Sequence, residues 1–545
     1  MKIFACMFCL LACLVCPVHY ASGALAFSPD SDYLRDRDAL DALQKDAFGY
    51  FWEDGDPVSG MAYEGNFRWE TRPVAVGGTG FGIASLVVAV DRGWITREQA
   101  IQRLMRITLF LRDNTAREQL HGAFPHWIDS ATGKAMVFSK GDQDADIVET
   151  SLLMQGLLIA RAYFNGPGVE ETLRSIITGL WEDVDWDWFT NKENNGIYWH
   201  WSPERGFRMG LRILGFNECM ITYVLAASSP THPISRKCYD YWTSGKGYKP
   251  KDVFGYRIEA SLPGAGPLFL TQYSFIGLDP RRLADAYVPN GYFVRNIKHT
   301  LSNRGYCLQN APAKNRYSEE FWGLTASQIK DGYAASDPAN DKGFIGPTGA
   351  LSSMPYTPHY SMQFLLNLRG RLRDKAWGPY GPYDGISLRD SWVSDRYLAI
   401  DQLPMVCMVE NYRSGLLWNL LMSDPDVRAG LEKAGLNEPA LRQGFPEMVV
   451  TVLKDGKKYV PDAVDLRRHP DNGLFSAPFW SDAAGPCLFS ITDQNGKELL
   501  SMEMQAAKGR NAVSFSQFMR PDSEVLTLTM QAPDGSKHSV PIRLH

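Results

Sequence analysis

The segment 141–151 gathers three aspartates and one glutamate just ahead of an apolar run. Asp142, Asp146 and Glu149 precede the run Leu152–Ala160. If that run is helical, Asp146 and Glu149 share one face of its first turns, because residues three apart lie side by side on a helix. Acids gathered in this way repel one another, so we expect some raised pKa values. The alternative is a structural role, since acids at a helix start complement the helix dipole.

Glu218 is a second candidate, because it stands inside the apolar segment Leu214–Tyr223. An unpaired buried carboxylate is costly, so this side chain either faces a cleft or has a partner such as Arg212. Apolar surroundings would keep it protonated near neutral pH, as a general acid requires. A protonated carboxyl group and a second carboxylate acting as base or nucleophile are what cleavage of a glycosidic bond needs.

Aromatic residues are abundant, with 15 Trp, 24 Tyr and 27 Phe among 545 residues. Flat rings stack on the apolar faces of sugars while their edges stay in water, so this abundance suits a sugar-binding cleft. Packing inside a large helical protein explains the same abundance equally well. The candidate sugar-binding residues are His126, Trp127, Trp199, Trp201, Tyr356, Tyr360, Glu410, Tyr412 and Arg413.

The sequence contains no motif that is typical of metal-dependent, phosphate-binding or serine-nucleophile enzymes. HExxH, a phosphate-binding glycine loop and a nucleophile elbow are all missing from the sequence. We therefore expect carboxylate chemistry with no metal and no obligatory cofactor. A net charge of −5 gives no basic excess to attract nucleic acid.

The N-terminus has the pattern of a secretory signal. Met1-Lys2 leads into an apolar run that ends at Val18, and Ala24-Leu25-Ala26 offers a cleavage site. We predict a signal peptide over 1–26 and export to the periplasm or beyond, with no stable membrane span. Lipid attachment at Cys13 is a less favoured alternative. The five later cysteines are widely spaced, and we expect buried free thiols at Cys219, Cys238, Cys307, Cys407 and Cys487.

Apolar residues recur at helical spacing over 35–440. Predicted helices are 38–52, 78–92, 96–113, 144–164, 169–183, 212–227, 281–303, 358–371, 404–422 and 425–434. Paired helices with long loops fit an all-α (α/α) toroid whose mouth is a cleft, although an irregular bundle has the same periodicity. Alternating segments separated by turn residues predict a C-terminal β-sandwich over 446–545. Its predicted strands are Met448–Leu453, Leu488–Thr492, Glu498–Met504 and Val525–Met530.

Several long motifs resemble the glycoamylase-like domain, glycoside hydrolase family 144. They are Phe216–Ile221, Ala227–Ile234, Glu320–Ser327, Pro347–Pro355, Tyr397–Gln402 and Glu410–Trp418. The resemblance implies an (α/α)6 barrel and inverting hydrolysis of β-1,2-glucan, endo or exo, to sophorose or short sophorooligosaccharides. It also implies that Glu149, Glu218 and Asp142 are the functional acids, whereas Asp146 is added from helical spacing alone.

The function stays open between three interpretations at this stage. The favoured one is a β-1,2-glucanase that acts as a monomer on a glucan oligosaccharide or polysaccharide, with Glu218 as proton donor and Glu149 or Asp142 activating water. The second is a hydrolase of another glucan linkage on the same scaffold, because a fold does not fix linkage. The third is a glycan-binding protein without catalytic activity.

Overall fold

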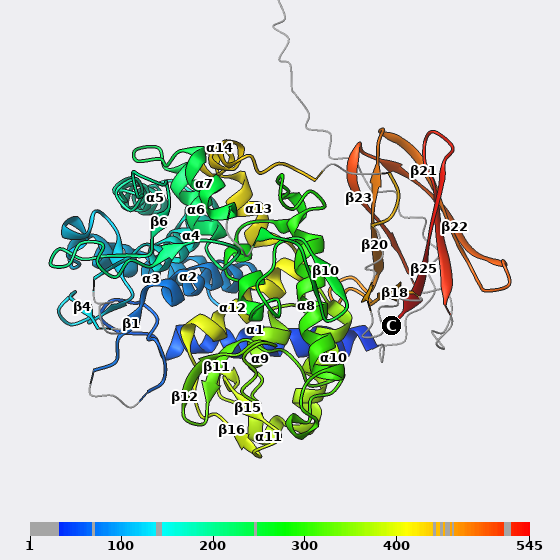
Figure 1. The fold of residues 1–545 in the computed structure, drawn as a ribbon, viewed down its shortest axis with the longest axis horizontal. Coiled ribbons are helices and arrows are strands. Elements are labelled where there is room, and N and C mark those ends of the chain that lie inside the picture. Colours follow the sequence, from blue (N-terminus) through cyan, green and yellow to red (C-terminus); the bar gives the residue numbers. More distant parts are fainter. Residues whose placement is uncertain are drawn as a thin grey trace, which may run out of the picture.

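The computed structural model of the chain describes residues 32–67, 71–137, 144–244, 248–439, 443–446, 451–452, 458–459, 463–516 and 525–545. A helix-rich body is followed by a smaller β-rich C-terminal part that lies beside it (Figure 1). The predicted signal peptide and Asp142 lie outside the described residues. Among the described helices, none is long and apolar enough to cross a membrane.

The body is built from helices of two kinds. Helices α2 (Val76–Asp91), α4 (Ile147–Tyr163), α6 (Met220–Ser228) and α12 (Ala399–Arg413) are buried over almost their whole length. The remaining described helices are α1 (Asp32–Glu53), α3 (Arg97–Asp113), α5 (Val169–Glu182), α7 (Arg236–Thr243), α8 (Tyr292–Gln309), α9 (Pro347–Leu351), α10 (Pro358–Arg371), α11 (Arg373–Ala376), α13 (Leu416–Ser423) and α14 (Pro425–Ala434). A helix that is apolar all round belongs in the interior of a protein. Helices α2, α4, α6 and α12 therefore form the core of the body.

Helices α2 and α4 touch backbone to backbone. A Cβ atom on Gly80 would lie 2.1 Å from the carbonyl oxygen of Leu152, and one on Gly156 would lie 2.0 Å from that of Gly80. No side chain fits such a gap, so glycine is required at both positions. The close approach brings the N-terminal ends of the two helices together.

Three predicted helices differ from the structure. The helix predicted over 281–303 begins only at Tyr292, as α8, because Pro280–Arg282 form a separate short turn of 3-10 helix and Gly291 takes a φ of 88°. The segment predicted as a helix over 212–227 begins with the short strand β8 (Arg212–Ile213), and helix α6 starts only at Met220, because Gly215 takes a left-handed φ of 81°. The helix predicted over 404–422 is two helices, α12 and α13, separated where Gly415 has a φ of 72°. Apolar periodicity continues through the breaks at Gly215 and Gly415, which is why it did not reveal them.

Short strands in the loops hold the polar segments together. Strands β2 (Phe124–Pro125), β5 (Ala145–Asp146) and β7 (His200–Trp201) form one sheet with β5 in the middle. Asp146 therefore pairs with Phe124 on one side and His200 on the other. Strands β11 (Ala326–Ile329) and β12 (Gly332–Ala335) form a separate hairpin.

The C-terminal part contains two sheets around one apolar core. Five strands are ordered β19 (Val464–Leu466), β25 (Lys537–Leu544), β24 (Leu526–Gln531), β21 (Gly485–Thr492) and β22 (Glu498–Ala506), while β20 (Phe475–Ser481) pairs with β23 (Gly509–Phe515). Three of the predicted strands coincide with β21, β22 and β24. The predicted strand Met448–Leu453 lies mostly outside the described residues, and its described part, β17 (Thr451–Val452), pairs with β10 (Tyr256–Ile258) of the body.

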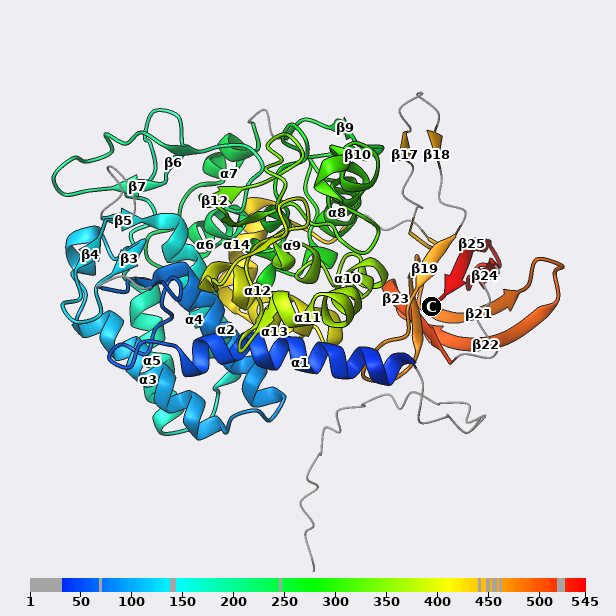
Figure 2. The same ribbon diagram turned by 90° about the horizontal axis from the view of Figure 1, so that it is seen from below.

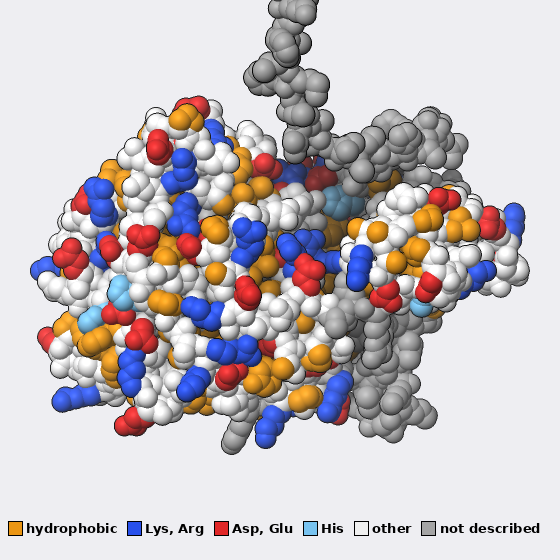
Figure 3. Space-filling view, turned by 90° about the horizontal axis from the view of Figure 1, so that it is seen from above, with side chains coloured by type: hydrophobic (Ala, Val, Ile, Leu, Met, Phe, Trp, Pro, Cys, Tyr) orange, Lys and Arg blue, Asp and Glu red, His pale blue; other side chains and the backbone are white. Residues whose placement is uncertain are grey.

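All five of the later cysteines are buried and free, as predicted. In Figure 3, cationic and anionic side chains are interspersed over the visible face, which matches the small net charge.

Buried ion pairs fasten the C-terminal part to the body. The guanidinium of Arg467 donates to both oxygens of Asp36 on α1, at 2.6 and 3.1 Å, and both side chains are at least nine-tenths buried. Helix α1 runs beneath the body as far as the C-terminal part (Figure 2). A second contact stacks the rings of His359 and His545 at 3.9 Å, and His545 also contacts Asp465 at 2.6 Å.

Substitution of Arg467 by leucine tests the buried pair. Asp36 would keep only the half-exposed Arg35 at 3.3 Å. We expect the free energy of unfolding, measured by denaturant titration, to fall by roughly 3 kcal/mol, the lower end for breaking a buried pair. Arg282→Ala is the control, because its pair with Glu438 is exposed on both sides and should contribute less than about 1 kcal/mol. Equal effects of the two substitutions would contradict this account.

Candidate active site

Six carboxylates from distant parts of the chain influence one another's charge inside the body, and we call them the acid cluster. They are Glu64, Asp146, Glu149, Glu218, Asp384 and Asp401. All are buried or half-buried. So many acids in one place resist simultaneous ionisation, and such perturbed groups gather where proton transfer is done.

Asp146 is the ionised member of the acid cluster. One of its oxygens caps helix α4 by accepting the N–H groups of Val148 and Glu149, both at 2.9 Å. The other oxygen faces His126 at 3.3 Å, the indole of Trp199 at 3.2 Å and His200 at 3.6 Å. Burial alone would raise the pKa of Asp146, but the hydrogen bonds and charges of the two histidines outweigh it and hold the pKa well below its usual range.

Glu149 lies between two helix N-termini. It sits in the first turn of α4, and its carboxylate accepts the N–H of Gly77, at the start of α2, at 2.7 Å. Its other oxygen is 4.0 Å from the ring of His126. Burial and the charge of Asp146 raise the pKa of Glu149, although His126 opposes them. The group can therefore exchange a proton near neutral pH.

His126 is the cation of the cluster. Burial disfavours its charged form, but the charge of Glu149 and the hydrogen bond to Asp146 overcome this and raise the pKa of His126 to about 10. A charged imidazole thus lies between two carboxylates and limits their mutual repulsion.

Glu218 lies in the turn just before helix α6. Burial, and then the negative charge of Asp146, raise its pKa to about 7. Among the ion pairs of the described residues Glu218 has none, and Arg212 instead lies over the ring of Tyr198 at 5.3 Å. The structural pair with Arg212 that the sequence left open is therefore not formed. Glu218 is suited to hold a proton at neutral pH.

Asp384 and Asp401 form a carboxyl pair within the acid cluster. Burial raises the pKa of both groups, and the charge of Asp384 raises the pKa of Asp401 further, so the pair retains a proton. Tyr273 and Tyr333 donate their hydroxyls to Asp401, at 3.2 and 2.8 Å. The charge of Glu218 acts on Tyr273, which places this pair near Glu218.

Three of the predicted sugar-binding residues lie at the acid cluster. His126 and Trp199 contact Asp146, and Trp127 is close enough to Glu64 to lower the pKa of that carboxyl group. Trp201 points elsewhere and packs against His121 and Trp188, with ring centroids 4.6 and 5.8 Å apart. Neighbouring residues of a strand face opposite sides, so Trp201 and His200 separate.

The other five predicted sugar-binding residues make contacts away from the acid cluster. Glu410 is fully buried in a bidentate pair with Arg92, at 2.8 Å for both bonds. Arg413 pairs with Asp41 and Asp471, and the ring of Tyr412 lies 5.5 Å from that of His469. Glu410, Tyr412 and Arg413 lie at the C-terminal end of α12, whereas Asp401 of the acid cluster lies in the first turn of the same helix.

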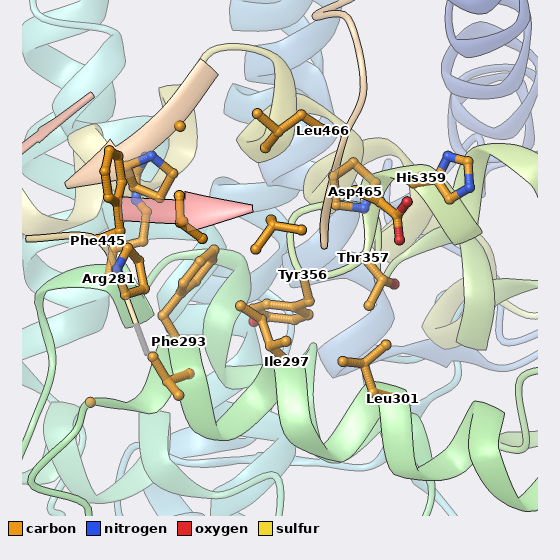
Figure 4. A pocket seen from close by; sticks show the side chains of 18 of the residues that line it. Arg281, Phe293, Ile297, Leu301, Tyr356, Thr357, His359, Phe445, Asp465 and Leu466 are labelled. Atoms are coloured by element: carbon orange, nitrogen blue, oxygen red, sulfur yellow. The ribbon is translucent and has the colours of Figure 1, made fainter. Parts of the chain in front are cut away.

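Tyr356 and Tyr360 line a different space, an apolar cavity of about 290 Å³ between the body and the C-terminal part (Figure 4). In this view Phe293, Ile297 and Leu301 rise into it from α8, facing Leu466 of the C-terminal part. Asp465 is the sole carboxylate among the described residues that line it, and Tyr360 donates to it at 3.1 Å. We do not assign bond cleavage to this cavity, because it lacks a pair of carboxylates.

Sequence reasoning missed Glu64, Tyr273, Tyr333, Asp384 and Asp401. Asp401 stood within a motif that had been noticed, but nothing in its spacing marked it as part of a site. Asp384 lies in the turn-rich segment 381–385, where no periodicity exists to interpret. Only the folded chain shows that these residues meet.

Comparison with known proteins identifies the family of this chain. The family model Glycoamylase, described as a glucoamylase model, matches residues 210–425. The endo-β-1,2-glucanase of Chitinophaga pinensis, solved with sophorotriose and glucose, is 44% identical, with a TM-score of 0.71 over 74% of this chain and 99% of that one. The chain belongs to the glycoamylase-like family, glycoside hydrolase family 144.

Two further matches come from Parabacteroides distasonis. An exo-β-1,2-glucooligosaccharide sophorohydrolase is 39% identical over 73% of this chain, which spans 58% of that relative's length. The crystal structure of a β-1,2-glucanase is also 39% identical, with a TM-score of 0.70 over 73% of this chain and 60% of that one. Both endo and exo enzymes are thus found among the family members similar to this chain.

The substitution Gly77→Ala tests whether the position of the Glu149 carboxylate matters for activity. An added Cβ would lie 2.5 Å from the Glu149 oxygen and 3.0 Å from a methyl group of Leu152, so the carboxylate must move. Because a displacement of about 1 Å can cost roughly 100-fold in rate, we expect a loss of 10- to 100-fold in kcat on the glucan substrate. Gly179→Ala on α5 is the control, since nothing lies within 4 Å of its added Cβ. An undiminished kcat in the Gly77 variant would show that the position of Glu149 is unimportant.

Proposed function

We propose that the chain is an exported enzyme that hydrolyses β-1,2-glucan, endo or exo, releasing sophorose or short sophorooligosaccharides. The observation that carries this proposal is the raised pKa of Glu218, about 7, beside the ionised Asp146. This pairing of a protonated and an ionised carboxyl group is what glycosidic cleavage uses. The linkage is supported by the β-1,2-glucan enzymes of the same family.

Glu218 is the proposed general acid. Its proton passes to the glycosidic oxygen as the bond from C1 to that oxygen breaks. Glu149, directly or through Asp142, takes a proton from the water whose oxygen forms the new bond to C1 from the opposite face. The products are two shorter glucans, and the configuration at C1 is inverted. Asp146 remains ionised and positions His126 and Trp199.

The proposal extends to the fold around the site, the oligomeric state, the cellular location and the C-terminal part. The inner helices α2, α4, α6 and α12 are proposed to belong to an (α/α)6 toroid, which is supported by the contacts of α2 with α4 and α12 and of α4 with α6. The chain is proposed to be a monomer that is directed to the periplasm or the cell exterior by its first 26 residues. The β-sandwich over 446–545 is proposed as an accessory part held by Asp36 and Arg467.

A panel of glucans with β-1,2, β-1,3, β-1,4, β-1,6 and α linkages tests the function. We expect reducing ends to appear with β-1,2-glucan alone, and a fall of at least about 1,000-fold in kcat for Glu218→Gln and Glu149→Gln, since each removes a group that transfers a proton. Glu438→Gln, on the surface, should match the parent.

Each alternative gives a different result in that panel. Release from another linkage would establish the second interpretation, and binding without release would establish the third. Near-parental rates in both cluster variants would overturn the assignment of the acids.

A further inference from the structure

The hairpin of β11 and β12 contacts both members of the carboxyl pair. The backbone N–H of Gln328 donates to Asp384, and the hydroxyl of Tyr333 donates to Asp401 at 2.8 Å. Gln328 and Tyr333 are directly opposite each other in the hairpin register. One short element therefore fixes the two buried acids together.

Tyr333 is unusual because its two ends lie in different environments. The side chain is 46% exposed, although its hydroxyl reaches Asp401, which is only 2% exposed. Burial of the phenol oxygen, with the charge of Asp401, raises the pKa of Tyr333 well above its usual value, so it remains a donor. Tyr333 is therefore anchored at its hydroxyl while part of the residue stays open to solvent.

The contacts of Asp401 connect Tyr333 to the proposed proton donor. Tyr273 donates to the same carboxyl group at 3.2 Å, and the charge of Glu218 acts on Tyr273. The charge of Glu64, near His126 and Trp127, acts on both Asp384 and Asp401. Tyr333 thus connects a partly exposed position on the hairpin to a buried carboxyl group of the acid cluster.

We propose that Tyr333 is a positioning and sugar-contacting residue of this site: its hydroxyl orients the Asp384 and Asp401 carboxyl pair, and its exposed ring stacks on a glucose unit of the bound glucan. The inference rests on the proposed glucanase function. Stacking on an apolar sugar face and a hydrogen bond to a buried carboxyl group are separable contributions, because one uses the ring and the other the oxygen.

Two substitutions in the full-length chain separate these contributions. Tyr333→Phe keeps the ring and removes the hydroxyl, so kcat should fall by roughly 10-fold or more, the effect of losing a hydrogen bond to a charged group, with KM little changed. Tyr333→Ala removes both, and its KM should also rise by roughly 3- to 10-fold, the usual effect of a lost aromatic contact.

The pH profile gives a readout that a merely structural role would not move. The hydroxyl of Tyr333 lowers the pKa of Asp401, so its removal raises that pKa. We expect the acidic limb of kcat/KM to move to higher pH in Tyr333→Phe. Tyr317→Phe is the matched control, because Tyr317 donates to Asp341 over the same 2.8 Å and should leave both kcat/KM and its profile unchanged.

Failure of this inference differs from failure of the proposed function. An active parent whose Tyr333→Phe variant keeps kcat and the acidic limb overturns the positioning role. An active parent whose Tyr333→Ala variant keeps KM overturns the stacking role. A parent that releases nothing from β-1,2-glucan overturns the function and, with it, this inference.

Discussion

The site depends on one buried negative charge, that of Asp146. A carboxylate in an apolar interior would normally take up a proton, but here two backbone N–H groups, an indole and two imidazoles surround it. Because Asp146 remains ionised, it discourages ionisation of its neighbours. The raised pKa values of Glu149 and Glu218 follow from burial and from this charge, so one anion brings two neighbouring carboxyl groups into the range where they exchange protons near neutral pH.

The fold delivers this arrangement through close packing of apolar helices. Gly80 and Gly156 let α2 and α4 meet at the backbone, and this contact brings the Gly77 N–H to Glu149. The strand β5 holds Asp146 between His200 and Phe124 before α4 begins. Hydrogen bonds of the β11–β12 hairpin hold Asp384 and Asp401. Each of these contacts joins residues that are far apart in the chain, so the site exists only in the folded protein.

Part of this arrangement could be predicted from the sequence. The apolar run after 141–151 identified α4, and the spacing of Asp146 and Glu149 placed both at its start. The acid within an apolar segment drew attention to Glu218. Helix breaks at Gly215 and Gly415 were missed, because periodicity reports which residues are apolar but not the local φ.

Residue type alone was a weaker guide to the sugar-binding side chains. Glu410 and Arg413 are polar and lie within a family motif, yet both are buried and form ion pairs, Glu410 with Arg92 and Arg413 with Asp41 and Asp471. A buried structural charge and a functional one have the same appearance in a sequence. Asp384, Asp401 and Tyr333 could not be found without coordinates, because hydrogen bonds between distant segments bring them together.

We infer that Glu218 holds a proton near neutral pH while Asp146 stays ionised, and the proposed cleavage depends on that proton. An infrared difference spectrum between the parent and Glu218→Gln, followed over pH, reports the protonation of this one side chain. The account predicts a protonated carboxylic acid band at pH 6 that is absent from the variant and disappears from the parent as the pH rises through about 7. A difference spectrum at pH 6 containing only an ionised carboxylate band would contradict it.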